Sequence, residues 1–171
     1  MATVGTNTLP RREPRSLAGL IAIHENNYFR LMRLAPDLGR FEGVYLSRVA
    51  GALDLYLCVL DRFKYTTSIC LTYRFDAKDL SEMDIFQPRA RIMIYHDARA
   101  VELIGHGRRQ VSRKIRPWRC GQMPELDRKW ELNRFLNKWL GFCGKQGHLF
   151  LEATAHRVER TPSIFGGVRN H

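Results

Sequence analysis

The stretch 89–106 holds the densest set of titratable side chains in the sequence and could present several of them together. Its candidates for binding or catalysis are Tyr95, His96, Asp97, Arg99 and Glu102. A neutral imidazole can accept a proton or a metal ion, and a nearby carboxylate supports either role. The stretch is therefore a candidate for a general base or for a small-ligand site.

The geometry expected for this stretch weakens the catalytic interpretation. We predict a β-hairpin turning at Asp97-Ala98, in which side chains alternate between the two faces of the sheet. The face toward the core then holds Ile92, Ile94, Val101 and Leu103. Glu102 lies on the face opposite His96, so the two do not form an evident dyad. The structural alternative is an aspartate that bonds its own backbone in the turn, beside a histidine paired with tyrosine or backbone groups.

Two asparagines lie inside segments that we predict to be helical, Asn26 in 16–35 and Asn133 in the helix that begins near Pro124. Asparagine is a poor residue for a helix interior, because its side chain competes for backbone hydrogen bonds. Each amide could bond the edge of a strand or line a ligand pocket. Structural bonding is the preferred interpretation, because buried polar groups are usually hydrogen-bonded.

The segment 107–122 is rich in arginine and contains no acidic residue. Its cationic residues surround one tryptophan, and the set is Arg108, Arg109, Arg113, Lys114, Arg116, Trp118 and Arg119. Arginine binds phosphate with two parallel hydrogen bonds, and an indole can stack on a base. The segment is a candidate nucleic-acid site, although no RRM, KH or helix-turn-helix signature accompanies it. The alternative is a solvated loop that Trp118 anchors to the sheet.

The whole chain is basic. Its 171 residues include 28 Lys and Arg against 17 Asp and Glu, which gives a formal net charge of +11. Such a balance favours anionic partners, and we consider RNA and an acidic protein surface. No apolar run reaches the ~18 residues of a membrane span, and the N-terminus lacks a signal-peptide pattern, so we expect a cytoplasmic protein. The four cysteines show no metal-ligand spacing, and we expect reduced thiols, no metal site and no cofactor.

The pattern of elements predicts an α+β fold. A helical stripe covers 16–35, and five short strands follow between 44 and 106, with a turn expected at 61–64 and a loop at 76–88. Together with a second helix after Pro124, they predict an antiparallel five-stranded meander flanked by an N-terminal and a C-terminal helix packed on one face. The other sheet face would be exposed to solvent or serve as a binding surface. We predict a flexible basic arm at 1–15, one domain at 16–147 and a basic tail at 148–171.

Three stretches carry a family resemblance. They are Glu25–Tyr28, Tyr95–Glu102 and Asn133–Cys143, with Tyr65-Thr66-Thr67 as a further match. Together they resemble the uncharacterised Gram-negative bacterial proteins known as domain of unknown function twelve forty-nine, over roughly residues 16–147. The resemblance implies a small cytosolic single-domain protein and transfers no catalytic residue. The basic ends and the Arg-rich segment depart from the family pattern.

The function expected from the sequence is binding rather than catalysis. Signatures of nucleophilic, phosphate-binding and metalloprotease sites are missing from the sequence. We therefore expect a non-catalytic binding or regulatory protein that holds RNA or an acidic protein through its basic segments. The alternative is a small-ligand-binding protein or hydrolase-like enzyme with its site at the 95–102 hairpin.

Overall fold

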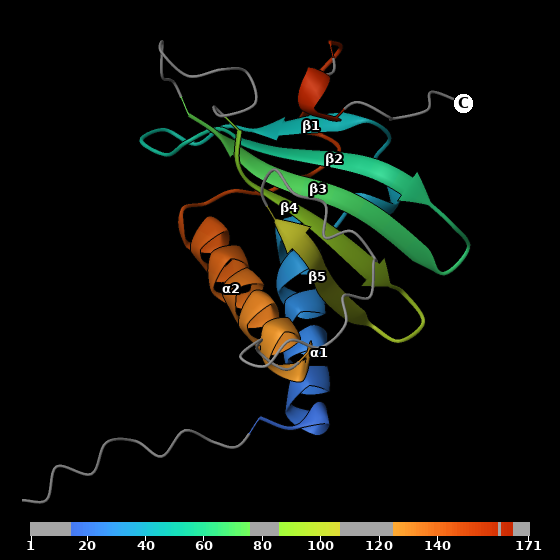
Figure 1. Ribbon diagram of the computed structural model, residues 1–171. Coiled ribbons are helices and arrows are strands. Elements are labelled where there is room, and N and C mark those ends of the chain that lie inside the picture. Colours follow the sequence, from blue (N-terminus) through green and yellow to red (C-terminus); the bar gives the residue numbers. More distant parts are fainter. Residues whose placement is uncertain (1–14, 76–85, 107–124, 161, 166–171) are drawn as a thin grey trace, which may run out of the picture.

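The structure is a computed structural model that describes residues 15–75, 86–106, 125–160 and 162–165. Two helices, α1 (Leu17–Leu34) and α2 (Glu125–Lys145), pack on the same face of a six-stranded sheet (Figure 1). The strands are β1 (Val44–Ser47), β2 (Leu55–Arg62), β3 (Thr66–Arg74), β4 (Phe86–Tyr95), β5 (Ala100–His106) and β6 (His156–Arg157), in the order β5-β4-β3-β2-β1-β6. The predicted α+β fold with both helices on one face is confirmed.

Both helices begin and end where local chemistry favours it. The Ser16 hydroxyl accepts a hydrogen bond from the Gly19 amide at 3.0 Å and so caps α1, as its residue type predicts. Pro36 follows the end of α1, since the residue before a proline avoids the helical region. Gly147, at φ +91°, follows α2 in the left-handed conformation that suits glycine after a helix. Neither helix in the described part of the chain is long and apolar enough to cross a membrane.

The predicted hairpin register is confirmed. Ile92 pairs with Leu103 and Ile94 with Val101, and all four side chains are at most 1% exposed. The turn covers residues 96–99, with Arg99 at φ 47°. The alternation of apolar residues therefore sets which face of this hairpin meets the helices.

The strands differ from the sequence-based bounds at two places. Strand β2 continues to Arg62 through an irregularity after Val59, where we predicted a turn from Asp61 onward. Strand β4 already begins at Phe86, inside the stretch predicted as a loop. Pro88 lies at a register shift between β3 and β4, because proline cannot donate a ladder hydrogen bond.

The second face of the sheet is covered over part of its area, where we expected an open surface. Tyr56, Cys58 and Phe86 lie on this face and are at most 6% exposed. Phe165, from the C-terminal segment, packs against Phe86 with ring centroids 6.1 Å apart. A covered face explains why β2 is buried along most of its length instead of alternating.

The C-terminal segment supplies the sixth strand. Residues 156–157 form β6 and pair with Tyr45 and Leu46 of β1, which adds a strand to the predicted five. Phe150 is fully buried in the core under the helices. The described part of the predicted tail 148–171 therefore belongs to the fold, because its few aromatic side chains bury apolar area on both sheet faces.

Two of the cysteines face each other across neighbouring strands. Cys58 of β2 pairs in register with Cys70 of β3, although the two are distant in sequence. Burial raises the pKa of both thiols to about 12. They are therefore protonated near neutral pH, and both are free thiols in the structure.

Candidate functional site

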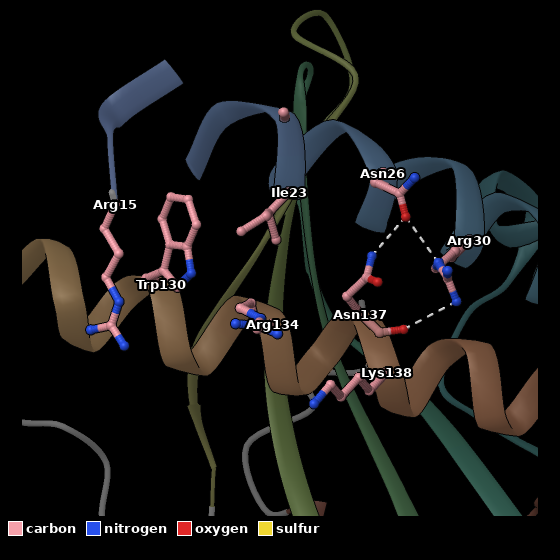
Figure 2. A pocket seen from close by; sticks show the side chains of 9 residues that line it. Arg15, Ile23, Asn26, Arg30, Trp130, Arg134, Asn137 and Lys138 are labelled. Carbon is pink, nitrogen blue, oxygen red and sulfur yellow. Dashed lines mark hydrogen bonds between the residues drawn. The ribbon is translucent and has the colours of Figure 1, made fainter. Parts of the chain in front are cut away.

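A groove lies between α1 and α2 in the described structure. The helices run parallel, with Gly19 beside Trp130 and Asn26 bonded to Asn137 (Figure 2). The groove has a volume of about 660 Å³. This lies in the range of about 300–1,000 Å³ that is usual for small-ligand sites.

Positive charge dominates the lining of the groove. Arg15, Arg30, Arg134 and Lys138 line it, and none of the described residues in its lining is acidic. Arg15 at one end pairs with Asp127 at 2.8 Å and with Glu131, and these partners raise the pKa of its guanidinium. Arg134 and Lys138 are exposed, and within the described residues neither pairs with a carboxylate. These two side chains keep their charge available for an anion.

Hydrogen bonds fix the opposite end of the groove. The side-chain oxygen Oδ1 of Asn26 accepts from Arg30 Nε at 2.9 Å and from Asn137 Nδ2 at 2.7 Å (Figure 2). Arg30 Nη1 also donates to the backbone carbonyl of Asn137 at 3.4 Å. A Cβ atom at Gly141 would collide with the Arg30 guanidinium, so glycine there leaves room for it. Arg30 is thus held across both helices, although its side chain is exposed.

A buried row of amides connects this groove to the edge of the sheet. Asn137 Nδ2 also donates to Asn27 Oδ1 at 3.0 Å, and Asn27 Nδ2 donates to the Asn133 carbonyl at 3.2 Å. Asn133 Oδ1 accepts from the Leu103 amide of β5 at 2.9 Å. Asn27 and Asn133 are fully buried, so the amides satisfy one another and the edge strand.

The two candidate asparagines therefore have different positions. Asn26 lines the groove, whereas Asn133 lies beneath it and bonds a strand edge, one of the two uses that we considered. No feature of a single sequence distinguishes these positions, because each depends on the rotation of one helix against the other.

The hairpin candidates contact separate neighbours. His96 Nε2 lies 2.8 Å from the Thr67 hydroxyl, and burial lowers the pKa of this imidazole, with the nearby Arg62 charge adding to the effect. Asp97 and Arg99 are exposed in the turn. His96 is thus held by a buried threonine and has no carboxylate bonded to its ring among the described residues.

Glu102 forms a different cluster. One of its carboxylate oxygens lies 3.0 Å from Lys129 Nζ of α2, and the other accepts from the Tyr95 hydroxyl at 3.5 Å. The structure thus brings Tyr95 and Glu102 together but gives His96 and Asn133 other partners. The residues proposed for a hairpin site do not converge on one point, which a catalytic constellation requires.

The arginine-rich candidates lie outside the described residues. This applies to Arg108, Arg109, Arg113, Lys114, Arg116, Trp118 and Arg119. The groove cations Arg30, Arg134 and Lys138 were not predicted from the sequence. Trp130, Arg134 and Lys138 recur every four residues, a spacing that puts them on one face of a helix. This helical spacing was the feature of the sequence that could have indicated the groove cations on α2.

A second polar cluster lies in the core near the end of α2. The Ser47 hydroxyl lies 3.1 Å from His148 Nδ1 and accepts from the Leu149 amide at 3.4 Å. Ser47 is 6% exposed and His148 is 3% exposed. A serine beside an imidazole can act as a nucleophile, but this pair is packed inside the fold instead of facing a substrate.

Neighbouring groups in this cluster are equally unsuited to nucleophilic chemistry. The Tyr73 hydroxyl donates to Gln146 Oε1 at 2.9 Å and lies 3.1 Å from Cys143 Sγ. Burial raises the pKa of the Cys143 thiol to about 11 and also raises the pKa of Tyr73. Within the described residues, no three His, Cys, Asp or Glu side chains come together as metal ligands. The cluster therefore serves packing.

His148 gives a testable pH dependence of stability. Burial lowers its pKa below the ordinary 6.5, against a smaller opposing effect of Asp54. Its Nε2 atom is buried and has no hydrogen-bond partner among the residues that the structure describes, so protonation would add a charge that nothing in the cluster bonds. The unfolded chain binds this proton more tightly, so stability is complete above about pH 6.5 and falls as the pH drops below it.

We expect urea unfolding to show a lower free energy of unfolding at about pH 5 than at about pH 7.5, and a smaller difference in His148→Gln. His24 and His96 also have lowered pKa values, so the variant keeps part of the dependence. If the difference in free energy of unfolding between the two pH values is the same in the unmodified protein and in His148→Gln, His148 has the same pKa in the folded and unfolded states.

The fold and the groove define a small α+β protein in which two parallel helices on one sheet face enclose a cationic recess. The chain belongs to the family described as Protein of unknown function (DUF1249), whose model matches residues 30–149. This agrees with the resemblance of the hairpin and helix stretches. No curated protein and no solved structure matches the chain.

Proposed function

We propose that this is a non-catalytic cytosolic protein that holds an anionic macromolecule, RNA or an acidic protein surface, through its basic surfaces. The groove between α1 and α2 is one of these surfaces. The observation that supports the proposal is the pair Arg134 and Lys138, two exposed cations in a recess whose lining has no acidic side chain in the described part of the chain. The net charge of +11 adds long-range attraction for such a partner.

The basic segment 107–122 is a second part of the proposal on sequence grounds. Its arginines and Trp118 have the composition of a phosphate-contacting and base-stacking segment. The groove and this segment can be tested separately, because Arg113, Lys114 and Arg116 can be replaced without touching the groove.

The test is binding of a labelled single-stranded RNA and of a labelled poly-aspartate peptide to the full chain, measured by fluorescence anisotropy at several salt concentrations. We expect the double variant Arg134→Ala/Lys138→Ala to lose about tenfold in affinity for the partner that the groove holds. If both residues contact phosphates, the slope of log affinity against log salt should also become shallower by about 1.4 for single-stranded RNA, because each phosphate contact contributes about 0.7.

A matched control removes the same charge elsewhere on the same helices. Arg33 and Lys145 are exposed and do not line the groove, so Arg33→Ala/Lys145→Ala should change affinity much less. Gly141→Ala is a second variant of the groove itself. Its new methyl group displaces the Arg30 guanidinium, while alanine favours the helix. It should weaken binding without lowering the melting temperature.

The outcomes are clear for each surface. Equal losses in the groove variant and the matched control would remove the groove from the proposal. An unchanged affinity in the Arg113→Ala/Lys114→Ala/Arg116→Ala variant would remove the segment. If neither anionic partner binds at low salt, the proposed function is rejected.

A further inference from the structure

One feature of the groove is not explained by charge. Trp130 lines it at the end near Arg15, in line with Arg134 and Lys138 along α2 (Figure 2). Residues four apart on a helix are about 6 Å apart along the axis, so the indole and the two cations form a short row. The groove therefore combines a flat aromatic group at one end with two cations beside it.

The indole is held in place by the neighbouring helix. A Cβ atom at Gly19 would lie 2.6 Å from the Cη2 atom of Trp130, so only glycine lets the ring approach the α1 backbone so closely. Trp130 is only half-buried even in this position. A ring that is fixed on one side and accessible on another is suited to stacking, because little conformational freedom is lost on binding.

We propose that this groove binds one nucleotide, with its phosphate at Arg134 and Lys138 and its base stacked on the Trp130 indole. The inference rests on the proposed function and selects a nucleotide, free or within an RNA chain, over an acidic protein as the ligand of the groove. Carboxylate side chains would use the two cations but would leave Trp130 unused, since they carry no flat π surface. Any nucleic-acid base can stack on the indole, and arginine binds the phosphate well.

The arrangement fits a single nucleotide better than a long tract. The recess of about 660 Å³ is bordered at one end by the hydrogen-bonded residues Asn26, Arg30 and Asn137 and at the other by Arg15, which is already paired with Asp127. The nucleotide could be free in solution or belong to an RNA chain. Both present the same phosphate and base, so the experiment must separate them.

The experiment compares four probes on the full chain by competition against a labelled oligoadenylate. They are AMP, unlabelled oligoadenylate, an abasic ribose-phosphate oligomer of equal length, and a poly-aspartate peptide. We expect the oligoadenylate to bind roughly five- to a hundredfold more tightly than the abasic oligomer, as base stacking on an aromatic side chain provides. Trp130→Leu should bring this ratio close to one and leave the affinity for the abasic oligomer unchanged.

Two further variants test whether the effect of Trp130→Leu comes from the loss of stacking. Trp130→Phe retains a ring for stacking and should restore part of the ratio. A purely structural role of Trp130 would instead change the affinities for the oligoadenylate and the abasic oligomer alike. Phe142→Ala removes an aromatic side chain of α2 that is 52% exposed and outside the groove lining, and should leave the ratio unchanged. Thermal melts of all variants show whether they remain folded.

The results separate this inference from the proposed function. Suppose that oligoadenylate and the abasic oligomer bind with equal affinity and that Arg134→Ala/Lys138→Ala weakens both. This result would overturn the inference that the groove binds a nucleotide, and the proposed anion-binding function would stand. Poly-aspartate binding as tight as oligoadenylate binding, with no effect of Trp130→Leu, would also overturn it. AMP competing as well as the oligomer supports a free nucleotide, and much weaker competition by AMP supports RNA.

Discussion

Trp139→Ala is expected to lower the free energy of unfolding by about 3–5 kcal/mol, the usual cost of removing a large aromatic side chain from a core. Trp139 is 7% exposed and belongs to the cluster that joins α2 to the sheet. Its ring meets Tyr73 of β3 edge-on, with centroids 5.7 Å apart, and stacks on Phe135 at 6.0 Å. Alanine would remove both contacts and leave a void between α2 and β3.

The measurement is urea unfolding at neutral pH, followed by circular dichroism. Phe142→Ala is the matched control, because this aromatic residue lies on the same helix but is 52% exposed, and it should cost less than about 0.5 kcal/mol. A loss below about 1 kcal/mol for Trp139→Ala would contradict the packing of α2 on the sheet.

The hairpin and both helices could be predicted because each has a local pattern. Alternation of Ile92 and Ile94 with Arg91, Met93 and Tyr95 sets the face of β4, and Ser16 marks the start of α1. These signals depend on residues within a few positions of one another. They hold in the structure because the core uses the same faces.

The C-terminal segment could not be predicted in this way. Its described part is held by a two-residue strand and by single aromatic side chains, Phe150 and Phe165, each in a stretch too short to show a period. The residues around these aromatics are rich in basic side chains, a composition that is typical of a solvated tail. Only the shape of both sheet faces reveals that these aromatics have places to pack.

The groove was missed for a related reason. It forms between residues more than a hundred positions apart, such as Asn26 and Asn137, and depends on how the two helices are rotated. The sequence directed attention to the clustered arginines at 108–119, whereas Arg134 and Lys138 look like ordinary surface charges on an amphipathic helix. Spacing alone cannot show that another helix completes a recess around them.

Asn133→Ala is expected to lower the free energy of unfolding by about 2–4 kcal/mol, since it combines an orphaned buried donor with a small void. Asn133 is fully buried, and its side-chain oxygen is the acceptor for the Leu103 amide of the edge strand β5. Leu103 is 1% exposed, so water cannot readily replace that acceptor. The change therefore leaves an unpaired N–H group inside the fold.

Two measurements together identify the cause. Urea unfolding gives the loss of stability, and hydrogen exchange should show that the Leu103 amide loses protection more than the amides of β3. Asn26→Ala is the control, because this exposed asparagine bonds Arg30 and Asn137 at the groove, where water can take its place, and it should cost well under 1 kcal/mol. Unchanged protection at Leu103 in Asn133→Ala would show that α2 does not cap the edge strand through this side chain.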